Sequence, residues 1–194
     1  MCLRHMRRAE AVPVPPGIDV CHSLLAYDEM AQRVVSRLKY RNDRRMLAWL
    51  ADGMAALLVP PDHCIVTWAP TTAVRRRSRG FDQAELLARA IARRWRVPCR
   101  CLLRRPPQPA QTGRSRTERQ QGAALLAARR GQRLAQPVVV VDDVVTTGTT
   151  LCHAAQVLRA VGATWIGAIT AAHTPECSRE QVGRMPSRLG RSPG

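Results

Sequence analysis

The chain has 194 residues, 45% of them hydrophobic, which is enough for one domain with a hydrophobic core. No apolar stretch approaches the roughly 18 residues that a membrane-spanning helix needs, and the N-terminal segment lacks an apolar signal-peptide core, so we expect a cytoplasmic protein with no membrane contact. The net charge of +17 predicts non-specific binding to polyanions at low salt, but an aromatic content of 4% leaves few platforms for stacking bases.

The N-terminal part of the chain is predicted to be a leader followed by two helices. Residues 1–22 read as an extended leader, because the prolines of 13–16 disfavour a helix. Apolar residues then recur at helical spacing in two segments, and Asn42 or Asp43 could cap the second of them. The prolines at 60–61 predict the end of that helix, and both helices are most simply packing elements.

A strand and a charged loop are predicted next. Residues 64–69, CIVTWA, predict a short strand, and Thr71 and Thr72 lie in the turn at its end. The cationic run at 75–79 follows, and its arginines are as easily a solvated surface as a ligand-binding group.

Residues 82–126 are predicted to continue with a helix, a strand and a long loop. Asp82 and Glu85 form a capping box that predicts an amphipathic helix, and the alternation over 97–103 predicts a strand. Residues 104–116 form a polar, arginine-rich loop of the kind that is usually functional or disordered in a compact domain. A short helix toward Leu126 is expected after it.

The most informative stretch is 137–150, which reads PVVVVDDVVTTGTT. Its four consecutive valines predict a strand buried on both faces, and Asp142 and Asp143 follow where that strand would leave the sheet. The loop after them consists of Val144, Val145, Thr146, Thr147, Gly148, Thr149 and Thr150. Its glycine permits close approach of the backbone to a ligand, and its amides and hydroxyls at a helix N-terminus favour an anion. Carboxylates followed by an oxyanion cradle predict a ribose 5-phosphate ligand.

Other phosphate motifs fit this stretch less well. A Walker A loop needs a lysine and a dinucleotide fingerprint needs three glycines, whereas this loop has no lysine and one glycine. The structural alternative is a core strand that ends in two solvated aspartates and an ordinary turn.

The C-terminal part predicts one more helix and one more strand. A helix follows the loop and is closed by Gly162, and residues 165–172 predict a strand. The domain organisation is therefore a leader at 1–22, an α/β domain at 23–173 and a disordered tail at 174–194. The alternation of strands and helices predicts a parallel sheet flanked by helices, with ligands at the carboxyl ends of its strands.

Three motifs in order carry a family resemblance: RGFDQAELLARAIA, QTGRSRTER and VVVVDDVVTTGTT. Over residues 24–173 the chain resembles the ComF/GntX family, a bacterial branch of type I phosphoribosyltransferase-like proteins, some of which are linked to DNA uptake in competence. The resemblance implies a type I phosphoribosyltransferase-like fold with extra N-terminal helices. Asp82 stands where family members usually have asparagine. The four-cysteine zinc module of many members is missing here, so no zinc is carried over.

The resemblance also implies roles for the acidic pair and the loop. Asp142 and Asp143 would hold the ribose hydroxyls and place Mg²⁺, directly or through water. The loop residues at 146–150 would hold the 5′-phosphate.

Roles on the pyrophosphate side follow from position. Thr71 and Thr72 would line this side because they follow the first strand of the predicted α/β unit. Arg79, or an arginine of 104–119, would offset the pyrophosphate charge, because a guanidinium presents a fixed fork of donors to phosphate oxygens.

The expected function is a phosphoribosyltransferase-like one. The predicted ligand is phosphoribosyl pyrophosphate or a related ribose 5-phosphate, bound with Mg²⁺, and the predicted activity is transfer of phosphoribosyl to an unidentified acceptor. The alternatives are a nucleotide-sensing protein that keeps the pocket without turnover and a protein that handles single-stranded DNA in competence. The sequence does not determine the oligomeric state, and a homodimer is one of the assemblies open to the chain.

Overall fold

Runs of β-branched and small apolar residues form a four-stranded parallel sheet with the order β1-β6-β5-β2. Its strands are β1 (Val20–Ala26), β2 (Ile65–Trp68), β5 (Val138–Val145) and β6 (Ile166–His173). The computed structural model describes residues 8–9, 12–41, 43–106 and 126–174. The helix predicted before Leu126, most of the arginine-rich loop and the tail from residue 175 lie outside the described residues.

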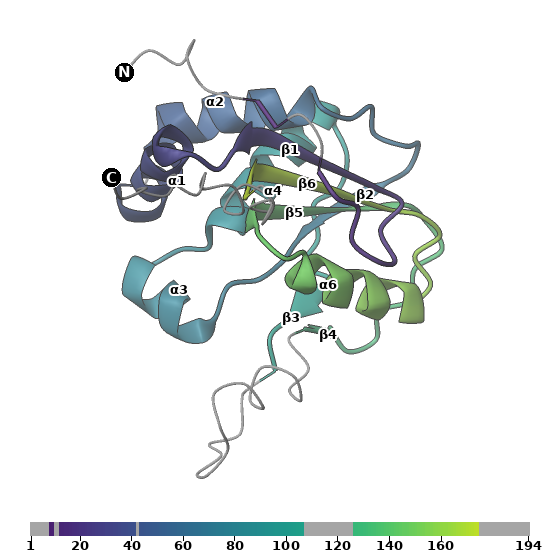
Figure 1. Cartoon of the computed structure of the whole chain (residues 1–194). Helices are drawn as coiled ribbons and strands as arrows, with labels where there is room; N and C mark the ends of the chain where they lie inside the picture. Colours follow the sequence, from purple (N-terminus) through teal and green to yellow (C-terminus); the bar gives the residue numbers. More distant parts are fainter. Residues whose placement is uncertain (1–7, 10–11, 42, 107–125, 175–194) are drawn as a thin grey trace, which may run out of the picture.

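Helices cover both faces of the sheet, as predicted for a parallel sheet (Figure 1). One face packs against α1 (Glu29–Arg41), α2 (Arg44–Ala55) and α4 (Gln83–Trp95), and the other against α6 (Thr149–Ala160). The four valines at the start of β5 are fully buried and alternate between the two cores. The predicted doubly buried strand and the extra N-terminal helices are therefore confirmed.

Capping residues place the ends of two helices that flank the sheet. Asp43 begins α2, because its Oδ1 accepts hydrogen bonds from the backbone N–H groups of Arg45 (3.0 Å) and Met46 (3.2 Å). Asp82 begins α4 in the same way. Gly162 follows α6 with a φ of +99°, the left-handed conformation expected just beyond a helix end.

The first strand was not predicted. β1 begins at Val20 and pairs with β6 from Val20↔Gly167 onward, so the boundary predicted at residues 22 and 23 falls inside this strand. Its sequence VCHSLLA interrupts the apolar residues with histidine and serine, and therefore lacks the pattern of a core strand. The chain before it is also partly in the core, because Pro15 and Ile18 are buried.

Two further segments differ from their predictions. The cationic run forms a short helix, α3 (Ala73–Arg79), that Thr72 caps and that has no buried residue, so no apolar periodicity announced it. The strand predicted over 97–103 is reduced to β3 (Leu103–Arg104), which pairs with β4 (Ala127–Ala128), and to one bridge between Val66 and Cys99. Pro98 lacks a backbone donor, which is consistent with so short a pairing beside β2.

Within the described ranges, no helix is both long enough and apolar enough to cross a bilayer.

Candidate functional site

The parallel pairing of β2 with β5 builds the site. Trp68 is in register with Val141, and the backbone N–H of Ala69 donates to the carbonyl oxygen of Val141 (3.0 Å). The residues that follow the two strands therefore leave the sheet at the same edge, although about 70 positions separate them in the sequence. This edge is where parallel α/β sheets bind their ligands.

A cavity of about 200 Å³ lies at this edge. Both predicted carboxylates, Asp142 and Asp143, line it. The other predicted residues in its wall are Thr71, Arg79, Thr146 and Thr150, together with Arg105, one of the arginines of 104–119. Arg75, whose role the sequence left open, lines it too, and the unpredicted residues include Asp82 and Gln83. Most of the site inferred from separate sequence segments is thus gathered around one space.

The remaining predicted residues lie next to this cavity. Thr147, Gly148 and Thr149 line an adjoining hollow of about 50 Å³, which shares Asp142, Thr146 and Thr150 with the cavity. Thr72 instead caps α3, where its Oγ1 accepts from the backbone N–H of Arg75 (3.3 Å), and it lines a different, larger space.

The acidic pair lies within β5, where Asp142 is in register with Thr170, and not beyond the strand as predicted, because pairing with β6 continues to Val145. The backbone that follows each carboxylate holds it. The N–H of Asp143 donates to Oδ1 of Asp142 (2.8 Å), and the N–H of Val144 donates to Oδ1 of Asp143 (2.8 Å). Burial raises the pKa of Asp142 well above its usual value, and the charge of Asp143 raises this pKa further. Burial likewise lowers the pKa of Arg105, despite the nearby charge of Asp142. The cavity therefore holds charged groups that protein contacts compensate incompletely.

The loop after the acidic pair leaves the start of α6 open. Gly148 is the N-cap residue, with a φ of +71°, so no side chain accepts from the first backbone N–H groups of this 12-residue helix. The hydroxyls of Thr147 and Thr149 lie 2.8 Å apart and are hydrogen-bonded to each other. Free amides at a helix N-terminus beside threonine hydroxyls suit a phosphate group.

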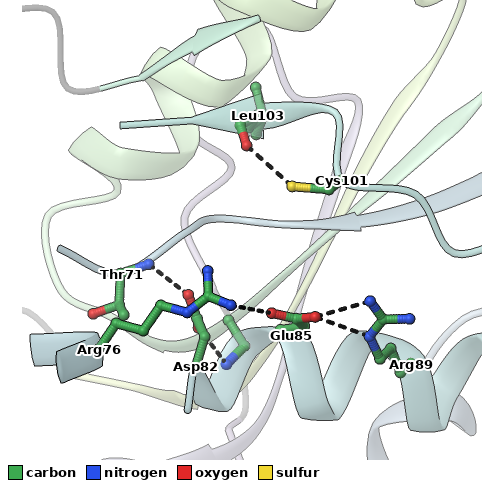
Figure 2. Close-up of polar contacts among 8 residues, drawn as sticks. Thr71, Arg76, Asp82, Glu85, Arg89, Cys101 and Leu103 are labelled. Atoms are coloured by element: carbon green, nitrogen blue, oxygen red, sulfur yellow. Dashed lines mark hydrogen bonds and ion pairs between the residues drawn. The ribbon is translucent and has the colours of Figure 1, made fainter. Parts of the chain in front are cut away.

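Asp82 connects the two halves of the site and was predicted only as a helix cap. Its carboxylate is buried, and its Oδ2 accepts from the N–H of Thr71 (2.8 Å, Figure 2). Its Oδ1 accepts from the N–H of Ala84 (3.1 Å). Burial raises the pKa of Asp82, although these N–H groups act in the opposite direction. One side chain thus joins the turn after β2 to the start of α4.

Glu85 does not complete the predicted capping box. Its carboxylate binds Arg89 through Nε (3.0 Å) and Nη2 (2.9 Å), and it also faces Arg76 at 3.9 Å (Figure 2). Glu85 therefore pairs with the two arginines and not with the backbone N–H at the start of the helix, because a guanidinium is a stronger partner than a backbone N–H.

Gln83 is a second residue that the sequence did not single out. Its side chain is only 2% exposed, and its Oε1 accepts from Nη1 of Arg79 (3.1 Å). Among the described residues, its Nε2 is the one buried side-chain polar atom with no hydrogen-bond partner. No sequence signal could have found it, because glutamine is ordinary in the first turn of a helix.

A larger cavity of about 650 Å³ adjoins the first one and shares Pro70, Thr71, Asp82 and Arg105 with it. Trp68, Cys101 and Leu103 contribute apolar wall. Its charged wall residues are Arg76, Arg77, Arg104, Arg105 and Arg129, set against Asp82 alone. This second space therefore favours a ligand that carries negative charge.

The acidic pair could contribute to a Mg²⁺ site only together with water and ligand oxygens. The described part of the chain contains no group of three or more His, Cys, Asp or Glu residues that could hold a metal by themselves. Mg²⁺ is usually bound by one or two carboxylates together with water and substrate phosphates. Asp142 and Asp143 supply the number of carboxylates that such an arrangement uses.

Changing Asp142 to asparagine is expected to stabilise the unliganded protein. Because the folded-state pKa is raised above the unfolded value, the ionised carboxylate lowers stability above that pKa, and the loss disappears as the pH falls toward the unfolded value. Asparagine keeps an oxygen for the N–H of Asp143 and removes the charge. We expect a higher melting temperature for Asp142→Asn than for wild type at pH 8, by about 2–4 °C for each kcal/mol recovered.

The difference in melting temperature should shrink between pH 8 and pH 4. Asp62→Asn, a change at an exposed aspartate outside both cavities, provides the matched control. A melting temperature for Asp142→Asn below that of wild type at pH 8 would contradict the expected cost of ionising this half-buried carboxyl group.

The fold and the site together define an α/β protein with an acidic pair and a threonine-rich loop at the carboxyl edge of a parallel sheet. The phosphoribosyl transferase domain family matches residues 82–185, more than half of the chain, and the chain belongs to this family. The type I phosphoribosyltransferase-like fold expected from the sequence is thereby confirmed.

Two curated relatives extend this assignment. The chain is 29% identical over 139 residues to competence protein ComFC of Bacillus subtilis, covering 70% of this chain and 56% of that protein, which confirms the resemblance to the ComF branch. It is 34% identical over 113 residues to adenine phosphoribosyltransferase of Gluconacetobacter diazotrophicus, covering 55% of this chain and 58% of that protein. The chain thus spans a little over half the length of these relatives.

Solved structures of similar proteins include adenine phosphoribosyltransferase from Trypanosoma brucei, with a TM-score of 0.46 and 16% identity over 96% of both chains. They also include orotate phosphoribosyltransferase from Aeropyrum pernix, with a TM-score of 0.43 and 20% identity over 88% of this chain and 75% of that one.

Proposed function

We propose that the protein binds phosphoribosyl pyrophosphate, or a related ribose 5-phosphate ligand, together with Mg²⁺ and transfers the phosphoribosyl group to an acceptor. The observation that carries the proposal is the meeting of the acidic pair, the open α6 N-terminus and an arginine-lined wall around one cavity. Each part matches one part of such a ligand, and the chain's family supports the same reading.

The ligand would lie across the carboxyl edge of the sheet. Its 5′-phosphate accepts from the amides and hydroxyls of the loop at 146–150, and its ribose hydroxyls donate to Asp142 and Asp143. The pyrophosphate then faces Arg79 and Arg105, which line the same cavity. This orientation pairs every charged part of the ligand with protein groups of opposite charge or with hydrogen-bond donors.

The transfer breaks the bond between C1 of the ribose and the pyrophosphate while the acceptor nucleophile bonds to C1. Positive charge develops on the ribose ring, and the nearby carboxylates of Asp142 and Asp143 stabilise it. Arg79 and Arg105 take up the charge of the leaving pyrophosphate. Bound Mg²⁺ would supply further neutralisation of pyrophosphate oxygens.

The acceptor would enter through the larger cavity, because that cavity shares Thr71, Asp82 and Arg105 with the ligand cavity. Since five arginines face one aspartate there, the proposed acceptor carries a carboxylate or phosphate. A neutral acceptor would add no negative charge to balance these guanidinium groups, although Arg76 already faces Glu85 and Arg105 donates to the carbonyl oxygen of Pro70.

Calorimetric titration tests the proposal. We expect phosphoribosyl pyrophosphate to bind wild-type protein in the presence of Mg²⁺, and ribose 5-phosphate to bind more weakly. Pyrophosphate release on addition of anionic heteroaromatic acceptors, compared with neutral bases, then tests transfer. Failure of phosphoribosyl pyrophosphate to bind would refute the proposed function, whereas binding without release for any acceptor would favour a sensor that keeps the pocket. Binding of single-stranded DNA stays a prediction. If single-stranded DNA binds this protein no more tightly than heparin does, the result would count against a specific role in DNA handling.

A further inference from the structure

The buried amide of Gln83 presents a donor that the protein itself does not use. Gln83 is the first residue of α4 and lines the 200 Å³ cavity, with 2% of its surface exposed. Its Nε2 has no hydrogen-bond partner among the described residues. Leaving a buried donor unpaired is unfavourable, so such an atom in a binding cavity points to a group supplied by a ligand.

Arg79 determines which way this amide faces. A guanidinium carries donors only, so the group of Gln83 that meets Nη1 of Arg79 at 3.1 Å must be the amide oxygen. Rotating the amide by 180° would bring its NH₂ group against the guanidinium, two donors face to face. The NH₂ group is therefore held away from Arg79, with one defined orientation.

The surroundings of Gln83 indicate what its NH₂ group would meet. Gln83 lines the cavity that contains Arg75, Arg79 and Arg105 together with the acidic pair, and it does not line the adjoining hollow, although Thr146 and Thr150 border both spaces. Because its amide oxygen is bonded to Arg79, we assign its NH₂ group to an acceptor beside the guanidinium groups and not to the 5′-phosphate. Ribose hydroxyls suit the carboxylates of the acidic pair instead, since they can donate to them.

We propose that Gln83 binds an oxygen of the pyrophosphate group and that this contact distinguishes a pyrophosphorylated ribose 5-phosphate from ribose 5-phosphate itself. The inference rests on the proposed function, because it takes the ligand of the cavity to be phosphoribosyl pyrophosphate. Arg79 positions the amide, and the amide adds a neutral donor beside the guanidinium groups. Selectivity for the substrate over a monophosphate then arises from the first turn of α4 and not from the phosphate loop.

The test compares two ligands in wild type and in Gln83→Leu, with Mg²⁺ present. Leucine is close in size and has no donor, so we expect phosphoribosyl pyrophosphate to bind about tenfold more weakly. Ribose 5-phosphate should bind within about twofold of wild type, because it does not reach Gln83. Gln32→Leu, at an exposed position of α1 outside both cavities, is the matched control and should change neither affinity.

A second variant covers the case in which leucine disturbs the fold. Gln83→Glu keeps an oxygen for Arg79 and presents a second oxygen, in place of the NH₂ group, to the pyrophosphate. At pH 8 we expect it to lose more affinity for phosphoribosyl pyrophosphate than Gln83→Leu does, with ribose 5-phosphate again unaffected. Melting temperatures of all variants identify any that do not fold.

Four outcomes separate the possibilities. Selective weakening of phosphoribosyl pyrophosphate binding supports the role of Gln83. Equal weakening of both ligands would show a structural role, and unchanged affinities would show that the amide only meets water; either result overturns the inference and leaves the proposed function intact. If wild-type protein binds neither ligand, both the proposed function and this inference are refuted.

Discussion

Replacing Asp142 and Asp143 together by asparagine is expected to weaken binding of phosphoribosyl pyrophosphate with Mg²⁺ by at least about a hundredfold. Each carboxylate would accept a charge-assisted hydrogen bond from a ribose hydroxyl, worth about 1.5–3 kcal/mol. Two such contacts amount to about 3–6 kcal/mol, which corresponds to about 10²–10⁴ in the dissociation constant. Loss of the charges also removes the two protein oxygens that would place Mg²⁺.

Calorimetry of the double variant measures this effect directly. Asp62→Asn serves as the control, because it removes one exposed carboxylate outside the cavity and should leave affinity unchanged. Asparagine preserves the shape of both side chains, and Asp142→Asn is expected to stabilise the fold, so lost binding cannot be put down to unfolding if the melting temperature is maintained. Unchanged affinity of the double variant would mean that the ligand lies elsewhere.

The second large effect is expected at Gly148, where alanine should damage both the fold and the phosphate loop. Gly148 has a φ of +71°, and a Cβ atom there would lie 2.9 Å from Cγ of Pro15, a buried residue of the N-terminal segment. Left-handed backbone costs a residue with a Cβ about 1–2 kcal/mol. Crowding of this kind adds about 1–3 kcal/mol. The loop can relieve the contact only by moving the amides that would hold the 5′-phosphate.

Gly131→Ala is the matched control for this experiment. Gly131 has a φ of +74°, nearly that of Gly148, but a Cβ atom there would have no neighbour within 4 Å. Urea unfolding should therefore show the cost of left-handed backbone alone at Gly131 and a larger loss at Gly148. Binding of ribose 5-phosphate should weaken about tenfold or more in Gly148→Ala and stay unchanged in Gly131→Ala.

Adding Pro15→Ala to Gly148→Ala separates the two causes. Alanine lacks Cγ, the nearer of the two ring carbons of Pro15 that a Cβ at Gly148 would meet. Part of the lost stability and affinity should return in the double variant if the contact matters. Equal effects of alanine at Gly148 and Gly131 would instead show that the N-terminal segment does not brace the loop.

The strand-loop-helix unit at 137–150 was predictable because its signals are local. Four adjacent valines favour a strand that is buried on both faces, and a glycine among threonines favours a turn into a helix, whatever the rest of the chain does. The structure places a strand and a helix there, although β5 runs on to Val145, past the acidic pair, because its pairing with β6 continues. Asp43 and Asp82 were likewise recognised as helix caps, since a cap depends on the two or three residues that follow it.

Local signals were insufficient for β1 and α3. β1 is held in the sheet by pairing with β6, a partner far along the chain, and its own pattern is mixed. α3 has no buried face, so capping by Thr72 and Gly80 defines it where hydrophobic periodicity could not. A strand partner stabilises β1 and two capping residues define α3, and neither feature belongs to the hydrophobic periodicity by which helices and strands are recognised in a sequence.

The sequence by itself determined the class of the fold, and it indicated the acidic pair and the loop after it as the candidate site, because these signals come from residues adjacent in the chain. Only the tertiary structure decided which residues lie opposite the acidic pair and the loop. The pairing of β2 with β5 brings Thr71, Arg79 and Gln83 to the carboxylates of Asp142 and Asp143. Strand order is a property of the whole sheet and is not written in any one segment. For the same physical reason the unpaired amide of Gln83 is visible only once the chain is folded.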